Sequence, residues 1–357
     1  MELKYKPDCE EALRRWDAFW HGELIDRPPT EITVRRQGAP ETPAVWYRDG
    51  WNGDFQGAIN KFEEWAATMY FAGETLPALK PRIGPDQGSA FMGGRVEFSE
   101  ENDTSWVLPS VDDWADIIPL RIDPANQYWQ YILAFYEVAD TRAAGKCLVR
   151  DLDMDIGLGA LAALRGYQQF CFDMVDQPEL VDELVAQVIP LFQQVYKAGF
   201  QAAGMERVGW TIFMGGLVGP GKGAMFCCDF SALISPEMFR RWVVPALETD
   251  TEFLDHSFYH LDGPDALVHL PSLLALPKLH GIQWVPGSGL ASEKPQHTWM
   301  ELFQTIQERG KAVQIWGNVE AIKWAHPQLR PELVTYIVNC SSSIEADEVL
   351  AWLCKHS

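Results

Sequence analysis

The sequence predicts an α/β protein of the (β/α)8 TIM-barrel class, built as a single domain over residues 1–357. Three observations predict this fold. The second half alternates apolar strand-like runs with helix-like runs at intervals of roughly 25–30 residues, the rhythm of a parallel barrel. Several of these runs are followed at once by polar or turn-forming residues, as where strands end at a barrel mouth. The length is normal for one elaborated barrel, and no linker divides the chain.

The first half begins with a helix and then becomes irregular. Asp8 and Glu11 form a capping pattern before apolar residues at helical spacing, which predicts a helix over 9–20. Proline and glycine crowd residues 74–105, as in loops that carry function, so we expect a helical and irregular N-terminal extension over the barrel mouth. Other elements expected here are a strand over 31–36, a helix over 60–73 and a hairpin over 96–108.

The remaining elements follow from apolar runs and helix caps. Pro178 suits the first turn of a long helix, and Ser235 with Pro236 starts another. Helices are expected near 125–140, over 160–176, over 178–204, from 235 onward, and from Ser342 to near Lys355; strands are expected over 146–153, 208–214, 256–262, 281–287, 312–318 and 335–341.

Composition excludes several classes of function. A net charge of −21 argues against binding nucleic acid or anionic membranes, which both require basic patches. No apolar run of about 18 residues is present, so no membrane span is expected. The seven cysteines form no regular framework and the charged start lacks a secretory signal, which predicts free thiols in a cytoplasmic protein. The 15 tryptophans are expected to be buried or to line a pocket.

The strongest candidate site is the stretch YHLDGP at 259–264. His260 and Asp262 are two residues apart on an extended chain, so their side chains leave on the same face. Imidazole and carboxylate at a strand end are half of a metal site, and they are equally usable as an acid/base pair. The residues at the other predicted strand ends are Asp151, Asp153, Gln283, Trp284, Trp316, Asn318 and Cys340. Imidazole, carboxylate and thiolate together suit Zn²⁺.

Each of these features also has a structural interpretation. A single cysteine in an apolar strand, such as Cys340, is commonly a packing residue. Asp151, Asp153 and Asp155 are acid/base candidates or caps of the following helix. Cys227 and Cys228 point opposite ways on an extended chain, so at most one of them reaches a given ion.

The glycine-rich stretch 216–223 resembles a phosphate-binding loop. It carries Gly223 where such loops have Ser or Thr, and no convincing helix follows, so we interpret it as a mobile lid loop.

These residues resemble the uroporphyrinogen decarboxylase-like superfamily, which includes the decarboxylase, corrinoid:coenzyme M methyltransferases and cobalamin-independent methionine synthase. The resemblance spans nearly the whole chain and is greatest to a subgroup with the HLDGP signature. It is carried by DRPP (26–29), YHLDGP (259–264), IQWVPG (282–287) and the terminal stretch that begins at Asn339. The resemblance implies a distorted (β/α)8 barrel with its site at the C-terminal mouth, and it admits a homodimer.

The methyltransferase branch binds zinc through His-x-Cys and a later cysteine, which map to His260, Asp262 and Cys340. Asp262 stands where those enzymes have Cys, and it is a harder ligand. The resemblance thus implies a zinc-dependent methyltransferase that moves a methyl group between a small methylated compound and a corrinoid protein or thiol. Asp229 or Asp153, with His260, would serve as catalytic groups. Substrate would contact Tyr259 and Gln283, and also Trp284, Trp316 and Trp106. The rings of these tryptophans could hold a methylated cation.

Two alternatives stay open. A metal-free decarboxylase would use aspartates and arginines to orient a carboxylated substrate. The decarboxylase branch meets substrate carboxylates with Arg-Gln-Ala-Gly-Arg, of which Arg36-Gln37-Gly38 is only a fragment. A barrel that has lost its chemistry and binds a ligand is the second alternative, and Asp262 in place of Cys is the feature that favours it.

Overall fold

The computed structural model describes residues 1–357 except 44–48, 82, 100–103, 151, 153–154 and 288–295. Its strands are β1 (Thr30–Arg35), β2 (Met69–Gly73), β3 (Ala78–Leu79), β4 (Arg95–Ser99), β5 (Thr104–Leu108), β6 (Leu148–Val149), β7 (Trp210–Ile212), β8 (Val218–Pro220), β9 (Gly223–Cys227), β10 (His256–Asp262), β11 (Gly281–Val285), β12 (Ala312–Asn318) and β13 (Val334–Asn339).

Helices precede, follow and connect these strands. The α-helices are α1 (Cys9–Trp20), α2 (Phe55–Thr68), α3 (Gln87–Phe91), α4 (Gln127–Ala143), α5 (Leu158–Arg165), α6 (Tyr167–Asp176), α7 (Pro178–Ala202), α8 (Met205–Val208), α9 (Pro236–Trp242), α10 (Val244–Phe253), α11 (Leu270–Ala275), α12 (Met300–Glu308), α13 (Val319–Ala325) and α14 (Ser343–His356). Short 3₁₀ turns are η1 (Trp114–Asp116), η2 (Met214–Gly216), η3 (Asp229–Leu233), η4 (Pro264–His269), η6 (Gln296–Trp299), η7 (His326–Gln328) and η8 (Pro331–Leu333). None of the described helices is both long enough and apolar enough to cross a membrane.

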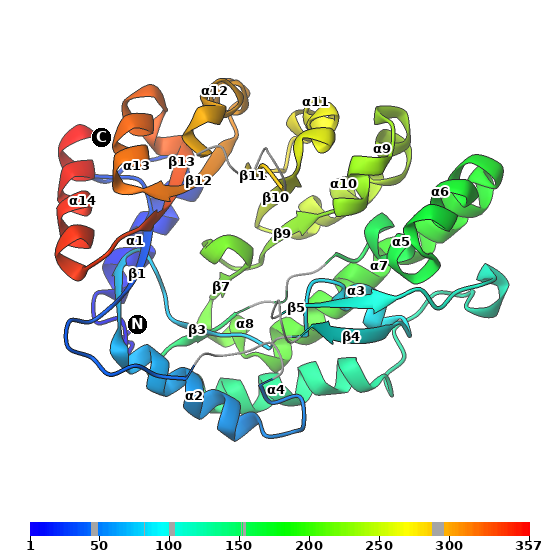
Figure 1. Cartoon of the computed structure of the whole chain (residues 1–357), viewed down its shortest axis with the longest axis horizontal. Coiled ribbons are helices and arrows are strands. Elements are labelled where there is room, and N and C mark those ends of the chain that lie inside the picture. Colours follow the sequence, from blue (N-terminus) through cyan, green and yellow to red (C-terminus); the bar gives the residue numbers. More distant parts are fainter. Residues whose placement is uncertain (44–48, 82, 100–103, 151, 153–154, 288–295) are drawn as a thin grey trace.

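The strands form a central, mainly parallel sheet with helices outside it (Figure 1). The order in the seven-stranded sheet is β2-β1-β13-β12-β11-β10-β9, and only the β2–β1 pair is antiparallel. Strand β3 pairs with β6, and a single bridge joins Arg150 to Ile212. Hydrogen bonds among the described residues do not join these sheets into one ring. The structure therefore confirms a barrel-like α/β arrangement without showing a closed barrel.

Alternation along the strands produces two apolar cores. On β11, Trp284 faces the outer helices while its neighbour Gln283 faces the inside of the curved sheet, as the two-residue period of a strand requires. The larger core lies between the sheet and those helices. A smaller core includes Phe258 and Met225 from the strands and Trp16 from α1. The inner face of the sheet therefore carries apolar residues near the strand starts and polar residues near the strand ends.

Helix α1 lies at the end of the barrel opposite the mouth. The ring of Trp20 stacks on His256, at the start of β10, with 4.4 Å between ring centroids. The Trp20 indole N–H also donates to the carbonyl of Val218 at 2.6 Å. The expected helix over 9–20 is confirmed, and its apolar face fills the bottom of the inner core. An N-terminal extension over the mouth stays a prediction.

The glycine-rich stretch over 216–223 is not a lid. Val218–Pro220 forms β8, which pairs with β7, and Val218 is fully buried against the inner core. Residues from Gly223 onward form β9, a strand of the main sheet. The glycines allow close approach of neighbouring groups: a Cβ at Gly219 would stand 2.6 Å from the ring of His256.

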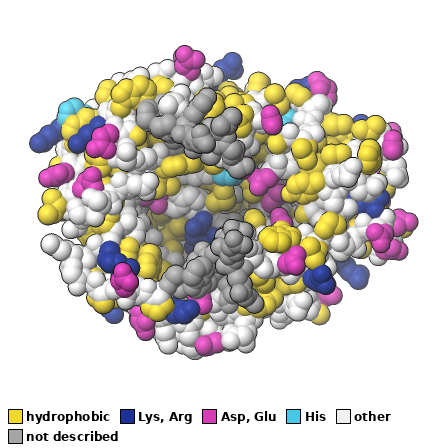
Figure 2. Space-filling view, in the orientation of Figure 1, with side chains coloured by type: hydrophobic (Ala, Val, Ile, Leu, Met, Phe, Trp, Pro, Cys, Tyr) yellow, Lys and Arg dark blue, Asp and Glu magenta, His cyan; other side chains and the backbone are white. Residues whose placement is uncertain are grey.

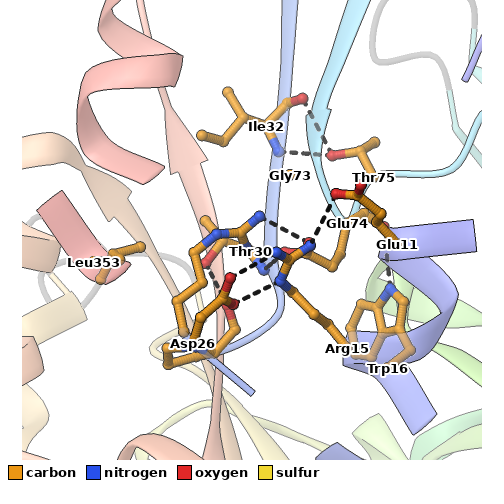
Figure 3. A network of polar contacts seen from close by, with 12 residues as sticks. Glu11, Arg15, Trp16, Asp26, Thr30, Ile32, Gly73, Glu74, Thr75 and Leu353 are labelled. Atoms are coloured by element: carbon orange, nitrogen blue, oxygen red, sulfur yellow. Dashed lines mark hydrogen bonds and ion pairs between the residues drawn. The ribbon is translucent and has the colours of Figure 1, made fainter. Parts of the chain in front are cut away.

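The DRPP stretch forms a buried ion-pair network at the bottom of the sheet (Figure 3). Glu74 is fully buried and accepts hydrogen bonds from both terminal nitrogens of Arg27 and from the Thr30 N–H. Arg15 of α1 makes two 2.7 Å bonds to the carboxylate of Asp26 and approaches Glu74 at 3.4 Å. This network joins α1, the start of β1 and the end of β2.

Several predicted elements need correction at their ends. Residues 69–73, expected in a helix, form β2 against β1, because aromatic Tyr70 and Phe71 extend the sheet. Of the strand expected over 146–153, the described residues form Leu148–Val149, followed by a single bridge at Arg150. The helix expected over 160–176 is divided at Gly166, whose φ of +86° interrupts the helix. The caps at Ser235 and Ser342 are confirmed, as is Pro178 in its first turn, whereas Asp8 makes no side-chain cap bond.

Candidate metal centre

Three side chains converge at the carboxyl ends of β9 and β10. His260 and Asp262 lie in the last three residues of β10. Asp229 is the first residue of η3 and comes two residues after the end of β9. One potential ligand atom of each lies within 4.8 Å of the others. Gly263 ends β10 with a φ of +81°, which turns the chain away from the group. We call this set the DHD group: Asp229, His260 and Asp262.

A row of hydrogen bonds orients His260. Neighbouring strands place His260, Gln283 and Gln314 in register on the inner face. The Gln314 amide N–H donates to the carbonyl oxygen of Gly215 at 2.9 Å, so its Oε1 faces Gln283. Gln283 then donates to Gln314 through Nε2 and presents Oε1 to the Nδ1 of His260 at 2.5 Å. Because a carbonyl only accepts, the row sets Nδ1 of His260 as the donor and leaves Nε2 for the two carboxylates.

The electrostatics of the DHD group suit a cation. Burial raises the pKa of Asp229 above its usual range, the His260 charge opposes that rise, and the negative charge of Asp262 adds to it. The Oδ1 atom of Asp262 is buried and has no hydrogen-bond partner. In the described part of the chain, no lysine or arginine is ion-paired with either carboxylate. An unsatisfied buried carboxylate oxygen beside an imidazole and a second carboxylate fits a divalent metal ion with nitrogen and oxygen ligands.

More carboxyl groups lie next to the DHD group. Burial raises the pKa of Asp155 well above its usual value, and the charges of Asp229 and Asp86 raise it further. Burial also raises the pKa of Asp86, against a hydrogen bond from the Val107 N–H, and Asp229 adds to the rise. Figure 2 shows acidic side chains and a histidine at the rim of a central hollow, with basic side chains inside it. The mouth thus gathers acids on the β9–β10 side.

Cys340 lies outside the DHD group. It follows β13, is half-buried, and packs against the outer core. Burial and the nearby charge of Glu345 raise the pKa of its thiol to about 11. Asp229, predicted as a proton-transfer group, takes the third position beside His260 and Asp262 instead.

The residues predicted to contact substrate lie in different parts of the fold. Trp284 is fully buried and packs on Trp299 at 5.1 Å, and Tyr259 packs edge-on against Phe239, so both belong to the outer core. Gln283 is buried and its amide is used in the row that orients His260. Trp284 and Tyr259 thus pack in the outer core, whereas Gln283 lies on the inner face beside His260; their contact with substrate stays a prediction.

The other predicted positions differ in exposure. Trp316 is half-buried near the end of β12, on the same face as Gln314. Trp106 is 42% exposed on the β4–β5 hairpin. Asp151 and Asp153 lie outside the described residues.

A cavity of about 640 Å³ opens across the mouth from the DHD group. Its wall includes Arg35 at the end of β1, Lys80 just after β3, Arg150 just after β6, and Gly216. The cavity lies next to the row of hydrogen bonds that orients His260. Gly216 lines the cavity, and the carbonyl of the preceding Gly215 accepts a hydrogen bond from Gln314.

Sequence reasoning missed Gln314 and the basic cavity. Gln314 is fully buried in an apolar strand, and a buried amide in such a strand requires hydrogen-bond partners. The sequence AVQIWGN over residues 312–318 shows this pattern, with Gln314 between apolar residues. Arg150 and Lys80 are separated by 69 intervening residues, and nothing in the sequence links them.

Comparison with solved structures shows the fold. The chain is similar to a methyltransferase from Methanosarcina mazei at 12% identity and a TM-score of 0.60, over 96% of this chain and 98% of that one. It also matches a B12-independent methionine synthase from Shewanella sp. W3-18-1, solved in complex with selenomethionine, at 10% identity and a TM-score of 0.48, covering 92% and 98% of the two chains. No protein-family model matches, and no curated protein matches by sequence.

Proposed function

We propose that this protein is a methyl-transfer enzyme whose DHD group binds a divalent metal ion, with zinc as the first candidate. The observation that carries the proposal is the convergence of Asp229, His260 and Asp262 at the strand ends. The choice of methyl transfer among metal-assisted reactions follows the family resemblance and the similar fold of the methyltransferase from Methanosarcina mazei. A corrinoid protein or a small thiol is the proposed partner in the transfer.

Each residue of the site has a distinct role in this proposal. His260 would ligate through Nε2, since Nδ1 donates to Gln283. Asp229 and Asp262 would supply the carboxylate oxygens, and the metal would act as a Lewis acid toward a thiol or a methyl-bearing heteroatom. Asp155 keeps its proton to a higher pH than an exposed aspartate, so it can return a proton to a leaving heteroatom.

Metal analysis tests the site independently of any substrate. The protein is dialysed against Zn²⁺, Mn²⁺ or Co²⁺, desalted and analysed by mass spectrometry for bound metal. We expect about one equivalent in the wild type and a loss of at least tenfold in affinity in Asp262→Asn. Asp265→Asn, an exposed aspartate on η4, is the matched control and should keep full occupancy. Equal occupancy in both variants would remove the DHD group from the proposal.

Activity is tested with a panel of O-, N- and S-methyl compounds as donors. The acceptors are free cob(I)alamin, followed by its absorption spectrum, and a small thiol, followed by mass spectrometry. We expect transfer that requires the metal and falls in His260→Ala. Turnover that is unchanged by chelator and by His260→Ala would contradict the proposed mechanism.

A metal-free carboxy-lyase is the second candidate, and the basic cavity favours it. Arg35, Lys80 and Arg150 could orient a substrate carboxylate. Release of CO₂ from a carboxylated substrate in the presence of chelator, with no methyl transfer from the donor panel, would favour this candidate over the first.

A further inference from the structure

His269 is a fully buried histidine that does not belong to the DHD group. It is the last residue of η4, and its ring is stacked on Phe239 of α9 with 4.3 Å between ring centroids. Its Nε2 lies 2.8 Å from the carbonyl oxygen of Ser231 in η3. Because a carbonyl only accepts hydrogen bonds, Nε2 carries the proton and donates it. One side chain therefore joins η4 to η3.

The two turns joined by this bond each begin beside a carboxylate of the DHD group. Asp229 is the first residue of η3, two positions before Ser231. Asp262 is the last residue of β10, and only Gly263 separates it from the start of η4. The distance between the two carboxylates therefore depends on how η3 is held against η4.

The bond from His269 is the long-range hydrogen bond of the Ser231 backbone. The Ser231 N–H donates to the Cys228 carbonyl at 2.9 Å, and the Ser231 carbonyl also accepts from the Ile234 N–H at 3.2 Å, so both of these bonds stay within three positions. The bond from His269 instead spans 38 positions. Phe230 packs η3 against α6, but apolar contacts have no preferred direction. The bond from His269 is therefore the contact that orients the turn.

The second ring nitrogen of His269 shows which of the two nitrogens this position requires. Burial lowers the pKa of His269, and the hydrogen bond to Ser231 opposes that shift, so the ring is neutral at pH 7. Its Nδ1 is buried and has no hydrogen-bond partner among the described residues, which costs stability. A leucine would avoid that cost. The presence of a histidine is therefore explained by the bond that Nε2 makes to η3.

We propose that His269 is a positioning residue of the candidate metal centre: its hydrogen bond to Ser231 holds η3 so that Asp229 keeps its place in the DHD group. The ligand that this arrangement serves is a divalent cation. The inference rests on the proposed function, because it concerns the same group of residues. It assigns part of the affinity for metal to a side chain that does not touch the ion.

Four variants separate the hydrogen bond from the volume of the ring. His269→Phe keeps an aromatic ring against Phe239 and removes the donor. His269→Gln has an N–H at the same number of bonds from the backbone as Nε2, so it is the conservative rescue. His269→Asn is shorter and cannot reach Ser231, so it replaces His269→Phe if that variant does not fold. The matched control is His326→Phe, since His326 is 2% exposed, bonds to the hydroxyl of Tyr336 at 2.9 Å and packs against α14.

Co²⁺ alone is the probe of the metal centre, because its visible absorption depends on the type and geometry of its ligands. We expect His269→Phe to weaken Co²⁺ binding by about tenfold or more and to change the spectrum. His269→Gln should restore both, and His326→Phe should change neither. Circular dichroism and the melting temperature establish that each variant is folded. Wild-type affinity and spectrum in folded His269→Phe would overturn the proposal and leave His269 with a structural role only.

Hydrogen exchange in the metal-free protein tests the same bond without any ligand. The Ile234 N–H shares the Ser231 carbonyl with His269, so its exchange reports the opening of η3. We expect the amides of η3 and Ile234 to exchange about tenfold faster in His269→Phe, and at the wild-type rate in His326→Phe. Amides in the middle of α7 should be unchanged in both variants. Unchanged exchange of the η3 amides in His269→Phe would overturn the proposal.

The two measurements separate this inference from the proposed function. Faster exchange of η3 in His269→Phe, with no Co²⁺ bound by the wild-type protein, leaves the orienting role of His269 standing and removes the metal from the proposed function. Tight binding of Co²⁺ by the wild-type protein that His269→Phe does not weaken does the reverse.

Discussion

Charged side chains are paired at the bottom of the barrel, whereas at the mouth carboxylates gather without a lysine or arginine partner among the described residues. At the bottom, Arg15, Arg27, Asp26 and Glu74 pair their charges within hydrogen-bonding distance. At the mouth, Asp229 and Asp262 face a histidine, and in the described residues neither is ion-paired with a lysine or arginine. The difference separates structural from functional charge: paired charges hold elements together, whereas gathered like charges cost stability and are retained where a ligand compensates them.

The largest expected effect is at the bottom. Arg27→Leu leaves the buried Glu74 without its main partner and should lower the free energy of unfolding by about 3–5 kcal/mol. Urea denaturation measures the change. The double variant Arg27→Leu with Glu74→Gln removes both charges and should recover part of the loss. A cost below about 1 kcal/mol for the single variant would show that the network is not structural.

Metal addition tests the other side of the comparison. Ions at 100 times their dissociation constant should stabilise the wild-type protein by about 2.7 kcal/mol, because they bind only the folded state. The same addition should leave Asp262→Asn nearly unchanged, as measured by the shift in the unfolding midpoint. A stabilisation of equal size in both proteins would mean that the ion binds elsewhere.

The pH dependence of stability tests Glu31, a residue of β1 whose pKa is raised by burial. Its folded pKa of about 8 exceeds the ordinary value of 4.5, so the folded state holds the proton more tightly than the unfolded state. Protonated Glu31 therefore makes its full contribution to the free energy of unfolding below pH 4.5. This contribution is lost as the pH rises toward 8, by about 1 kcal/mol per pH unit. Glu31→Gln should lose less stability than the wild type between pH 5 and pH 8 in urea titrations. Parallel curves would show that Glu31 does not titrate in this range.

The smallest expected effect is in the metal-free protein. Asp262→Asn removes one of two neighbouring negative charges and should stabilise the metal-free form by a few tenths to about 1 kcal/mol. Asp265→Asn, which is exposed and outside the DHD group, should change stability by less than about 0.5 kcal/mol. Destabilisation by Asp262→Asn without metal would mean that this carboxylate stabilises the fold, like Glu74.

Local pattern was sufficient for much of the second half of the chain. The strands β10 to β13 coincide with the predicted ranges to within two residues at each end, since apolar alternation and immediate turn residues are local signals. The HLDGP stretch likewise fixed His260 and Asp262 on one face of a strand end. Prediction was poorer for β2, β6 and β8, which are short and depend on pairing with distant strands.

What the sequence determined by itself was the α/β class, the position of the His-x-Asp pair and the helix caps at Ser235 and Ser342, because each depends on residues a few positions apart. Only the tertiary structure decided that Asp229 joins the pair while Cys340 does not, and that α1 lies at the bottom of the barrel. It also decided that Arg35, Lys80 and Arg150 share one cavity. These outcomes depend on how strands distant in sequence are placed side by side, and a spacing along the chain carries no information about that distance in space.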